Sequence, residues 1–520
     1  MSATYLVIGA GVNGLACASE LAKAGKKVVV LEQRTQVGGL SGRRSFGAPA
    51  DGFSVPGVRH DTQEIRPALV ESLGLQKKGV TLLADFEPLF ASDEQSGLVL
   101  HGAPEAAREE IAKRSAKDAD AYAAFRSLMT HMRKVLDPLV DKPPPPVLPR
   151  GMGELFDMGL MGLKLRGMGP RDMVEVMRAA PMCVADWMRE QFETELVSAT
   201  LAFHACVGDF VGPWSPGTAA MLMIREALLV PGVKGGPAAV VDALVATLAE
   251  QGVEVRTNAK VGALRVQGTR ITGVALEGGE EIAADVVVCA CSPKHALGEL
   301  LPPLVLSTAD TASVRTIRSR GTAAKVHLGL RAAPTWRGRP GQSFARVRVG
   351  GAHLDDLERA FDAVKYRELA DKPVLDIAVS ESNGKPVLSI LVHAAPYTLD
   401  AGWSETTRNT LLQSVLNVLE SHAPGTRDSV VASEVLSPMD IESEFGIPGG
   451  SLHHTERALD QMVLMRPARP FARYATPIEG LYVGSSGCHP GPGVTLAPGV
   501  LSARAALARG TSGSIRPPAR

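Results

Sequence analysis

The residues with the clearest chemical meaning in this chain are three glycines and one acid near its start. Gly9, Gly11 and Gly14 form a Gly-x-Gly-x-x-Gly motif, and Glu32 follows eighteen residues after Gly14. Gly9 permits a tight turn, Gly11 lets the backbone approach a pyrophosphate, and Gly14 lets a helix pack closely. A helix N-terminus offers unpaired N–H groups and a positive dipole end to that pyrophosphate. Because the Glu32 carboxylate can accept hydrogen bonds from ribose hydroxyls, the pattern predicts a dinucleotide site.

The segments around this motif predict a strand, a helix and a second strand. Residues 4–8 are a short apolar run, a helix-like stretch continues to Ala24, and a second apolar run covers residues 27–31. The motif therefore opens a helix, and Glu32 stands at the end of the second predicted strand. A glycine-rich turn that binds no ligand is the alternative interpretation.

Composition and termini restrict the function further. Lys plus Arg equals Asp plus Glu at 55 each, so no net field favours nucleic acid or an anionic membrane. The six cysteines form no CxxC pair and have no zinc-like spacing, which argues against a disulfide reductase and a metal site. Only three residues precede the first strand, and no apolar run reaches membrane-span length, so we expect a cytoplasmic protein. Residues 511–520 are expected to be a flexible tail.

The residues after the second strand resemble a particular group of dinucleotide enzymes. Glu32-Gln33-Arg34, followed by Gly38-Gly39, is similar to the extension found in FAD enzymes of the superfamily that joins flavin amine oxidases to phytoene desaturases. The resemblance implies that FAD is the cofactor, with Glu32 at the adenosine ribose and Arg34 near the adenine. It places Gly38 and Gly39 beside the pyrophosphate, although a surface turn is the alternative for that pair.

The last glycine-rich block supports the same resemblance. Residues 484–494 read GSSGCHPGPGV after a predicted strand at 481–483, and a helix is predicted to start near Val494. The block is similar to the C-terminal signature of the phytoene desaturase and carotene ketolase branch. Residues 208–224 and 452–467 match this branch too. The likeness is greatest to its members related to pyridine nucleotide-disulfide oxidoreductase domain proteins.

The resemblance implies further cofactor contacts along the chain. Gly484 and Ser485 would lie near the phosphate and ribityl chain, and Val261 near the adenine. Val494 and Thr495 would offer N–H groups to the pyrimidine end of the flavin, where reduced flavin carries negative charge. Many relatives have an acid in place of Ser485. The remaining cofactor-binding residues that we predict are Val12, Asn13, Gln33 and Gly493.

Two residues are candidates for catalysis. Lys325 lies in GTAAKVHLGL (321–330), which resembles the strand that in flavin amine oxidases holds a lysine contacting flavin N5 through water. A solvent-facing strand lysine is the equal alternative. His489 is the best titratable candidate near the ring, but we favour a structural hydrogen-bonding role for it. His60 and His454 are weaker candidates and are expected to be structural.

The predicted architecture is an α/β fold with two parts. A Rossmann-like FAD-binding domain is assembled from the discontinuous segments 1–65, 225–295 and 455–510. A mixed α+β substrate domain, with a helical lid region, takes 66–224 and 296–454. Within the lid region, residues 152–170 are rich in Gly and Met. We interpret them as a mobile loop with one short helix packed on the core, and a lid or membrane-touching patch as the alternative.

The predicted function is that of an FAD-dependent oxidoreductase of desaturase or oxidase type. It would remove hydride from an apolar small molecule, such as an isoprenoid or carotenoid-like compound or a natural-product intermediate. No second glycine-rich nucleotide motif lies between residues 66 and 450, so we expect an external electron acceptor, oxygen or a quinone. A flavin amine oxidase, a redox-neutral isomerase and a flavin-binding interaction protein remain alternatives. A peripheral membrane contact and the oligomeric state are left open.

Overall fold

The first β-sheet of the computed structural model is built from segments that lie far apart in the chain. The structure describes residues 4–48, 52–146 and 151–510; the expected tail at 511–520 lies outside them. The five strands, all parallel, run in the order β17 (Leu481–Val483), β11 (Val286–Cys289), β1 (Thr4–Ile8), β2 (Lys27–Leu31) and β7 (Glu254–Arg256). All five fall within the three segments predicted for the FAD-binding domain. The predicted α/β Rossmann-like fold is therefore confirmed.

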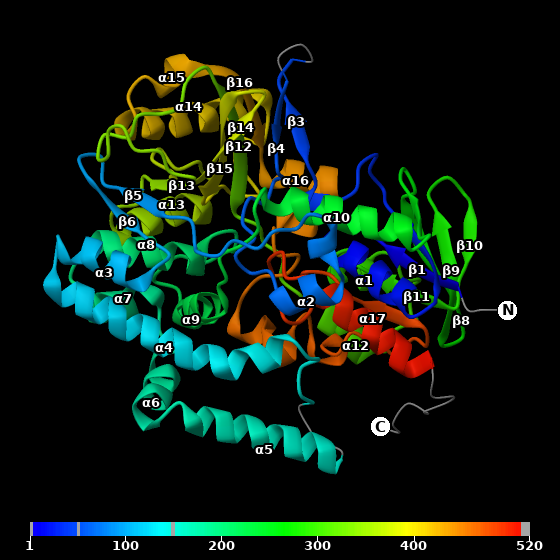
Figure 1. Ribbon diagram of the computed structural model, residues 1–520. Coiled ribbons are helices and arrows are strands. Elements are labelled where there is room, and N and C mark those ends of the chain that lie inside the picture. The colour runs from blue at the N-terminus through cyan, green and yellow to red at the C-terminus, as the bar shows by residue number, and fades with distance from the viewer. Residues whose placement is uncertain (1–3, 49–51, 147–150, 511–520) are drawn as a thin grey trace.

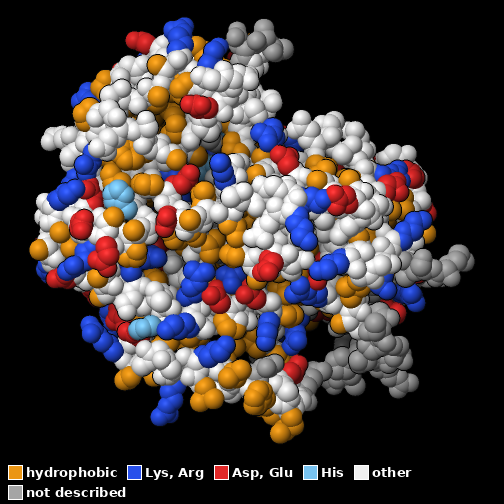
Figure 2. Space-filling view, in the orientation of Figure 1, with side chains coloured by type: hydrophobic (Ala, Val, Ile, Leu, Met, Phe, Trp, Pro, Cys, Tyr) orange, Lys and Arg blue, Asp and Glu red, His pale blue; other side chains and the backbone are white. Residues whose placement is uncertain are grey.

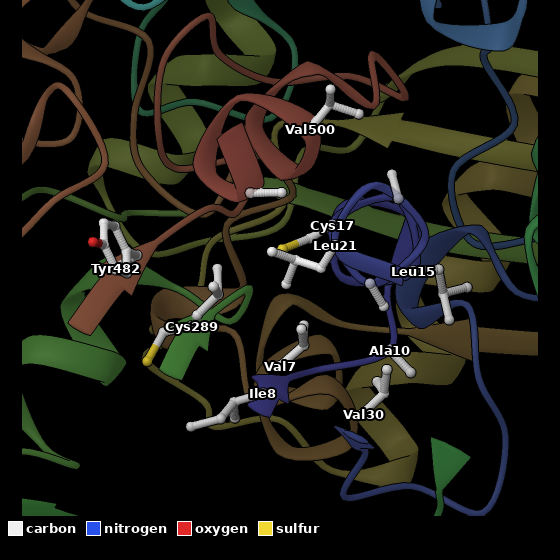
Figure 3. Close-up of a cluster of buried hydrophobic side chains, with 14 of the residues drawn as sticks. Val7, Ile8, Ala10, Leu15, Cys17, Leu21, Val30, Cys289, Tyr482 and Val500 are labelled. Atoms are coloured by element: carbon white, nitrogen blue, oxygen red, sulfur yellow. The ribbon is translucent and has the colours of Figure 1, made fainter. Parts of the chain in front are cut away.

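Three helices cover this sheet: α1 (Val12–Lys23), α10 (Gly236–Glu250) and α17 (Ala497–Gly510). The strands are buried on both faces, which explains their continuous Val, Leu and Ile runs. Figure 3 shows side chains of β1, α1 and α17 in one buried cluster, with Val7, Leu15 and Val500 among them. The first and the last described helices, α1 and α17, are thus packed against each other beside this sheet (Figure 1).

A second, larger sheet forms the other half of the molecule (Figure 1). Its order is β16 (Val430–Leu436), β12 (Ala323–Leu330), β15 (Lys385–His393), β14 (Val374–Ser382), β13 (Arg346–Val349), β5 (Leu89–Ser92) and β6 (Gly97–Leu100). All neighbours are antiparallel except β13 and β5. β12 is buried along its whole length, unlike a half-exposed edge strand. The strands all lie in the segments predicted for the substrate domain, whose boundaries stay a prediction.

Smaller elements complete the fold. β8 (Val261–Gln267), β9 (Arg270–Leu276) and β10 (Glu281–Ala283) form an antiparallel sheet, and β3 (Arg44–Phe46) pairs with β4 (Phe53–Val55). The longer helices outside the first sheet are α3 (Pro104–Ala112), α4 (Ala116–Val140), α5 (Met152–Gly167), α6 (Pro170–Ala179), α7 (Val184–Gln191), α8 (Glu195–Cys206), α9 (Thr218–Leu228), α13 (Leu354–Lys365), α14 (Glu405–His422) and α16 (Pro438–Phe445). The shorter helices are α2 (Pro67–Ser72), α11 (Pro293–Gly298), α12 (Thr308–Arg315) and α15 (Thr426–Ser429).

The segment 152–170 differs from our favoured interpretation. Most of it forms α5, a 16-residue helix that lies along the lower edge of the molecule (Figure 1). Phe156 is 72% exposed and Leu163 is 66% exposed, so the helix is not packed on the core. Its leucines and methionines favour a helix, and their spacing places apolar side chains all around it. No helix among the described residues is long and apolar enough to cross a membrane.

Candidate functional site

A cavity opens where the parallel strands β1 and β2 end, and we call it the dinucleotide cavity. Its volume is about 970 Å³, including the part open to solvent. Ligands of such sheets bind beyond the carboxyl ends of the strands. Eleven of the predicted cofactor residues line it, namely Gly9, Gly11, Val12, Asn13, Glu32, Gln33, Arg34, Gly38, Gly39, Val261 and Gly493.

The glycines of the motif have different surroundings, and these match their expected roles. A Cβ atom on Gly11 would meet no atom of a described residue within 4 Å, so its backbone faces open space. A Cβ atom on Gly14 would lie 1.8 Å from the Gly9 carbonyl oxygen, so this position holds the helix against the turn. Gly38 has a φ of 102°, and a Cβ there would lie 2.5 Å from the Gly42 Cα. Gly11 and Gly38 are bridged, so both glycine motifs form one wall.

Glu32 is a buried acid held by backbone groups. The Ala10 N–H donates to its Oε2 at 2.7 Å, and the Arg34 N–H donates to its Oε1 at 3.0 Å. These bonds fix the carboxylate at the cavity wall, where each oxygen keeps a lone pair for a ligand. The Arg34 guanidinium lies 4.3 Å from the centre of the Phe445 ring and pairs with Glu444 at 2.7 Å. This rigid, planar end of the cavity suits an adenine ring.

The residues of the dinucleotide cavity fit FAD. Asn13 is buried beside the motif, and its Nδ2 donates to the Ser486 hydroxyl at 3.0 Å. Its Oδ1 is buried and finds no partner among the described residues, so a ligand donor would satisfy it. The open face of Gly11 adds the space that a pyrophosphate needs.

Five predicted contacts, namely Gly14, Gly484, Ser485, Val494 and Thr495, lie outside the lining of this cavity. Gly14 serves packing, and Gly484 does as well, since a Cβ there would lie 2.1 Å from the Ser502 hydroxyl. Ser485 is fully buried, and its hydroxyl accepts from the Gly487 N–H at 3.1 Å. Val494 is also fully buried. The contacts predicted for Gly484, Ser485 and Val494 are therefore not visible as open surface, and they stay predictions.

The helix after this turn begins later than we predicted. α17 starts at Ala497 rather than near Val494, because Leu496 has a φ of 66°. The Thr495 hydroxyl accepts from the Ala497 N–H at 3.3 Å and so satisfies the first N–H of the helix. Thr495 lines a neighbouring cavity, described below, and not the dinucleotide cavity.

Lys325 is fully buried on β12, which rules out the solvent-facing lysine. Its Nζ lies 2.7 Å from His60 Nδ1, and His60 Nε2 lies 3.1 Å from Asp376 Oδ2. Asp376 in turn accepts from the Arg348 guanidinium at 2.8 Å. Because Asp376 accepts from Nε2–H, the His60 Nδ1 is left as the acceptor for Lys325. The four side chains form one buried chain of hydrogen bonds.

Burial and neighbouring charges shift the acid–base equilibria along this chain. Burial lowers the pKa of Lys325 to about 7, against the opposing effect of Asp376. Burial and the Lys325 charge lower the pKa of His60 to about 4, so the ring is neutral at pH 7. The Arg348 guanidinium and His60 hold the pKa of Asp376 well below its usual range despite burial. Only Lys325 therefore changes its charge near neutral pH.

His60 brings this chain to a second space, the ionic cavity. It has a volume of about 530 Å³, including open solvent, and shares Arg59 and Leu452 with the dinucleotide cavity. Its lining contains His60, Asp61, Glu64, His204, Arg225, Asp376, His453 and Arg457. The sequence offers His60 only as a weak candidate, and it does not point to Asp376 or Arg348. The residues of this hydrogen-bonded chain lie far apart in the sequence, so their spacing gives no motif. The one local signal is that His60 is followed by Asp61.

His489 has the structural arrangement that we favoured. Its Nε2 donates to the carbonyl oxygens of Leu139 at 2.8 Å and Lys142 at 3.1 Å, at the end of α4. Burial lowers its pKa to about 4, so the ring is neutral at pH 7. His454 lines the dinucleotide cavity. Among the described residues, no group of three His, Cys, Asp or Glu side chains is placed to hold a metal ion.

Comparison with known proteins gives the family. The family described as flavin-containing amine oxidoreductase matches residues 13–506. The mouse pyridine nucleotide-disulfide oxidoreductase domain-containing protein 2 is 30% identical, over 95% of this chain and 91% of that protein. A lycopene-forming phytoene desaturase of Pantoea ananas is 25% identical, over 96% of this chain and 97% of its own length.

A solved structure shows the same fold. An oxidoreductase from Methanosarcina mazei superposes with a TM-score of 0.60 at 15% identity, over 96% of this chain and 100% of the other. The predicted branch, the FAD cofactor and the enzyme class are all confirmed. The chain, with its glycine motifs meeting at one cavity, belongs to the flavin-containing amine oxidoreductases and is an FAD-dependent oxidoreductase.

Proposed function

We propose that this enzyme is of desaturase or oxidase type and removes hydride from an apolar small molecule. The observation that carries the proposal is a third space, the apolar cavity, beside the residue predicted to face the flavin pyrimidine. Its volume is about 590 Å³, including open solvent. Its lining comprises Glu64, Arg66, Val140, Met221, Ile224, Arg225, Leu228, Arg457, Met462, Pro490, Pro492 and Thr495.

This lining suits a substrate without charge at its reacting end. Val140, Met221, Ile224, Leu228 and Met462 offer apolar surface that excludes water from a bound molecule. FAD, when bound, supplies the hydride acceptor, and the chain's own side chains position the C–H bond and keep water out. The apolar cavity meets the ionic cavity at Glu64, Arg225 and Arg457. Hydride transfer would thus occur in the apolar cavity, next to the ionic cavity that holds His60 and Asp376.

The electron acceptor that we propose is external, oxygen or a quinone. Support comes from the sequence, which has no second glycine-rich nucleotide motif between residues 66 and 450. Amine oxidation is less well supported. Such enzymes usually flank the flavin with two aromatic side chains, and the described residues lining the ionic and apolar cavities include no Phe, Tyr or Trp. An isomerase or a flavin-binding interaction protein would share the same cofactor residues.

An anaerobic substrate screen tests the proposal. The purified yellow protein is mixed with polyenes, isoprenoids, natural-product intermediates and amines, and bleaching of the visible flavin band is recorded without added NAD(P)H. We expect bleaching by an apolar compound and recovery of the colour on adding oxygen or a quinone. Bleaching by amines alone would replace the proposal with amine oxidation. Product formed without bleaching or an acceptor would indicate an isomerase, and no reduction by any compound would favour the interaction protein.

We also propose that α5 brings the enzyme to a membrane surface. Apolar side chains gather at the lower edge of the molecule in Figure 2, where Figure 1 places α5. Met152, Leu155, Phe156 and Leu163 are each more than half exposed. Because Lys164 and Arg166 lie in its last turn, the helix can anchor apolar side chains while its charges stay at the lipid headgroups.

Replacing Phe156 and Leu163 together with serine is expected to weaken binding to phosphatidylcholine vesicles by about tenfold or more, because two large apolar side chains no longer enter the bilayer. Co-sedimentation measures the bound fraction. The control is Tyr366→Ser, since Tyr366 is 71% exposed but lies after α13, on another element. Equal vesicle binding by all three proteins, or none by the unsubstituted enzyme, would contradict the membrane contact.

A further inference from the structure

A fourth space, which we call the arginine cavity, lies beyond the ionic cavity. Its volume is about 680 Å³, including open solvent. It is lined by four arginines: Arg126 from α4, Arg225 from α9, and Arg346 and Arg348 from β13. Arg346 and Arg348 are two positions apart on one strand, so both side chains point to the same face of the sheet. Arginines gathered in a cavity are suited to hold a planar anion.

Three of these arginines are neutralised by carboxylates of the chain. Arg126 pairs with Glu226 at 2.8 Å, and Arg225 pairs with Asp61 at 2.7 Å. Arg348 donates to Asp376 at 2.8 Å, to the Thr200 carbonyl at 2.6 Å, and contacts His204 Nε2 at 2.9 Å. Each of these guanidinium groups therefore has a close anionic partner.

Arg346 differs from the other three. Its nearest carboxylate oxygen is Asp61 Oδ2 at 3.8 Å, and this same oxygen already accepts from Arg225 at 2.7 Å. Its Nη2 is buried and has no hydrogen-bond partner among the described residues. Glu87 lines the same cavity but is exposed at its rim. A buried guanidinium donor without a partner is costly unless a ligand completes it.

The arginine cavity adjoins the spaces where we place the reaction. It shares His204 and Arg225 with the ionic cavity, and Arg225 also lines the apolar cavity. Arg225 thus stands where the three spaces meet. A molecule with an apolar body beside Thr495 and an anionic end near Arg346 would pass this residue. The four arginines face the three carboxylates that pair with Arg126, Arg225 and Arg348, and the exposed Glu87 at the same cavity. At most one positive charge is therefore left over, which matches a singly charged carboxylate better than a phosphate dianion.

We propose that the arginine cavity binds a carboxylate group of the substrate, with Arg346 as its principal donor. The substrate class is then an apolar carboxylic acid rather than a pure hydrocarbon. This inference rests on the proposed function, since it describes the far end of the molecule whose C–H bond is oxidised. Arg225 and Arg346 share the Oδ2 atom of Asp61, at 2.7 Å and 3.8 Å, so the ion pair of Arg225 leaves the Arg346 donor open to the ligand.

Binding to the oxidised holoenzyme tests the inference without any turnover. Octanoate, 1-octanol and octyl phosphate are titrated separately by calorimetry, and the change in the visible flavin spectrum is recorded in parallel. We expect octanoate to bind more tightly than the other two compounds. Arg346→Gln should weaken octanoate binding by about tenfold to a hundredfold and leave 1-octanol unchanged, because one charge-assisted pair is lost.

Two further variants complete the test. Arg359→Gln is the control, because Arg359 is an exposed arginine on α13, and its octanoate affinity should equal that of the unsubstituted enzyme. Arg346→Lys keeps the positive charge but loses the paired N–H donors of the guanidinium, so we expect a loss of octanoate affinity between none and that of Arg346→Gln. This second variant keeps the test decisive if Arg346→Gln does not fold. FAD content and melting temperature are measured for each protein.

The possible outcomes separate this inference from the proposed function. No octanoate binding, or binding unchanged in both Arg346 variants, would overturn the carboxylate site even if an apolar compound bleaches the flavin. Tighter binding of octyl phosphate through Arg346 would overturn the choice of carboxylate. Octanoate binding that depends on Arg346, in an enzyme that no compound reduces, would support the site while the proposed reaction fails.

Discussion

Replacing Lys325 with methionine is expected to slow anaerobic flavin bleaching by about a hundredfold while FAD stays bound. Lys325 does not line the ionic cavity itself; it holds His60, which does. The change removes the donor to His60 Nδ1 and leaves a buried acceptor unpaired. Lys325 is thus a positioning residue, and the rate loss reports a His60 ring that is no longer fixed between Lys325 and Asp376.

The pH dependence of stability gives a readout that is separate from activity. The pKa of Lys325 is about 7 in the folded protein, against 10.5 for an ordinary lysine. Between these two values the unfolded chain binds more protons, so the free energy of unfolding rises with pH in this window. In Lys325→Met this contribution is absent. The melting temperature of the unsubstituted enzyme, relative to the variant, should therefore rise from pH 7 to pH 10.

A double-mutant cycle tests whether Lys325 and His60 act together. His60→Gln and Lys325→Met should each slow bleaching strongly, and the double variant should be little slower than either single one. Lys372→Met is the control, since Lys372 is exposed. If the fold-losses in bleaching rate of the two single variants multiply in the double variant, Lys325 and His60 do not act together. The buried, titrating Lys325 is contradicted if the melting temperatures of Lys325→Met and the unsubstituted enzyme depend on pH in the same way.

The cofactor half of the molecule could be predicted largely from the sequence. Its signals are local: Gly9, Gly11 and Gly14 follow a strand directly, and Glu32 ends the next one. The physical reason is that turn geometry and a helix N-terminus need particular residues at fixed spacing. The late start of α17 was missed because Leu496 adopts a left-handed conformation that leucine rarely shows.

The substrate half could not be predicted in the same way. Arg348 and Asp376 meet because β13 pairs with β14, and His60 reaches Asp376 from a loop near the start of the chain. The sequence alone does not show whether a strand lysine such as Lys325 is buried or exposed. Likewise the apolar residues of 152–170 suggested a packed segment, since burial is the usual outcome for such residues. Tertiary contacts decide these cases.

Gly11→Ala and Gly14→Ala are expected to fail in different ways, although both alter one motif. A methyl group on Gly14 would lie 1.8 Å from the Gly9 carbonyl oxygen and 3.2 Å from the Ala290 Cβ. Backbone cannot yield there without separating α1 from the sheet, so we expect little folded protein, or a melting temperature lower by about 10 °C or more.

A methyl group on Gly11 meets no described residue within 4 Å, so Gly11→Ala should fold and melt, as apoprotein, within about 2 °C of the unsubstituted apoprotein. It would occupy the space that the pyrophosphate needs, so FAD affinity should fall by about a hundredfold or more. Apoprotein melting and FAD titration by flavin fluorescence quenching measure the two effects.

The control is Gly278→Ala, which should bind FAD normally, because its Cβ also meets no described residue within 4 Å and its φ is not positive, but it lies in the turn between β9 and β10. Normal FAD binding by Gly11→Ala would show that the pyrophosphate does not lie on this glycine, and a well-folded Gly14→Ala would contradict the close helix contact. Because Gly14 is crowded by the protein backbone and Gly11 is open, the two variants separate the role of the motif in folding from its role in binding the cofactor.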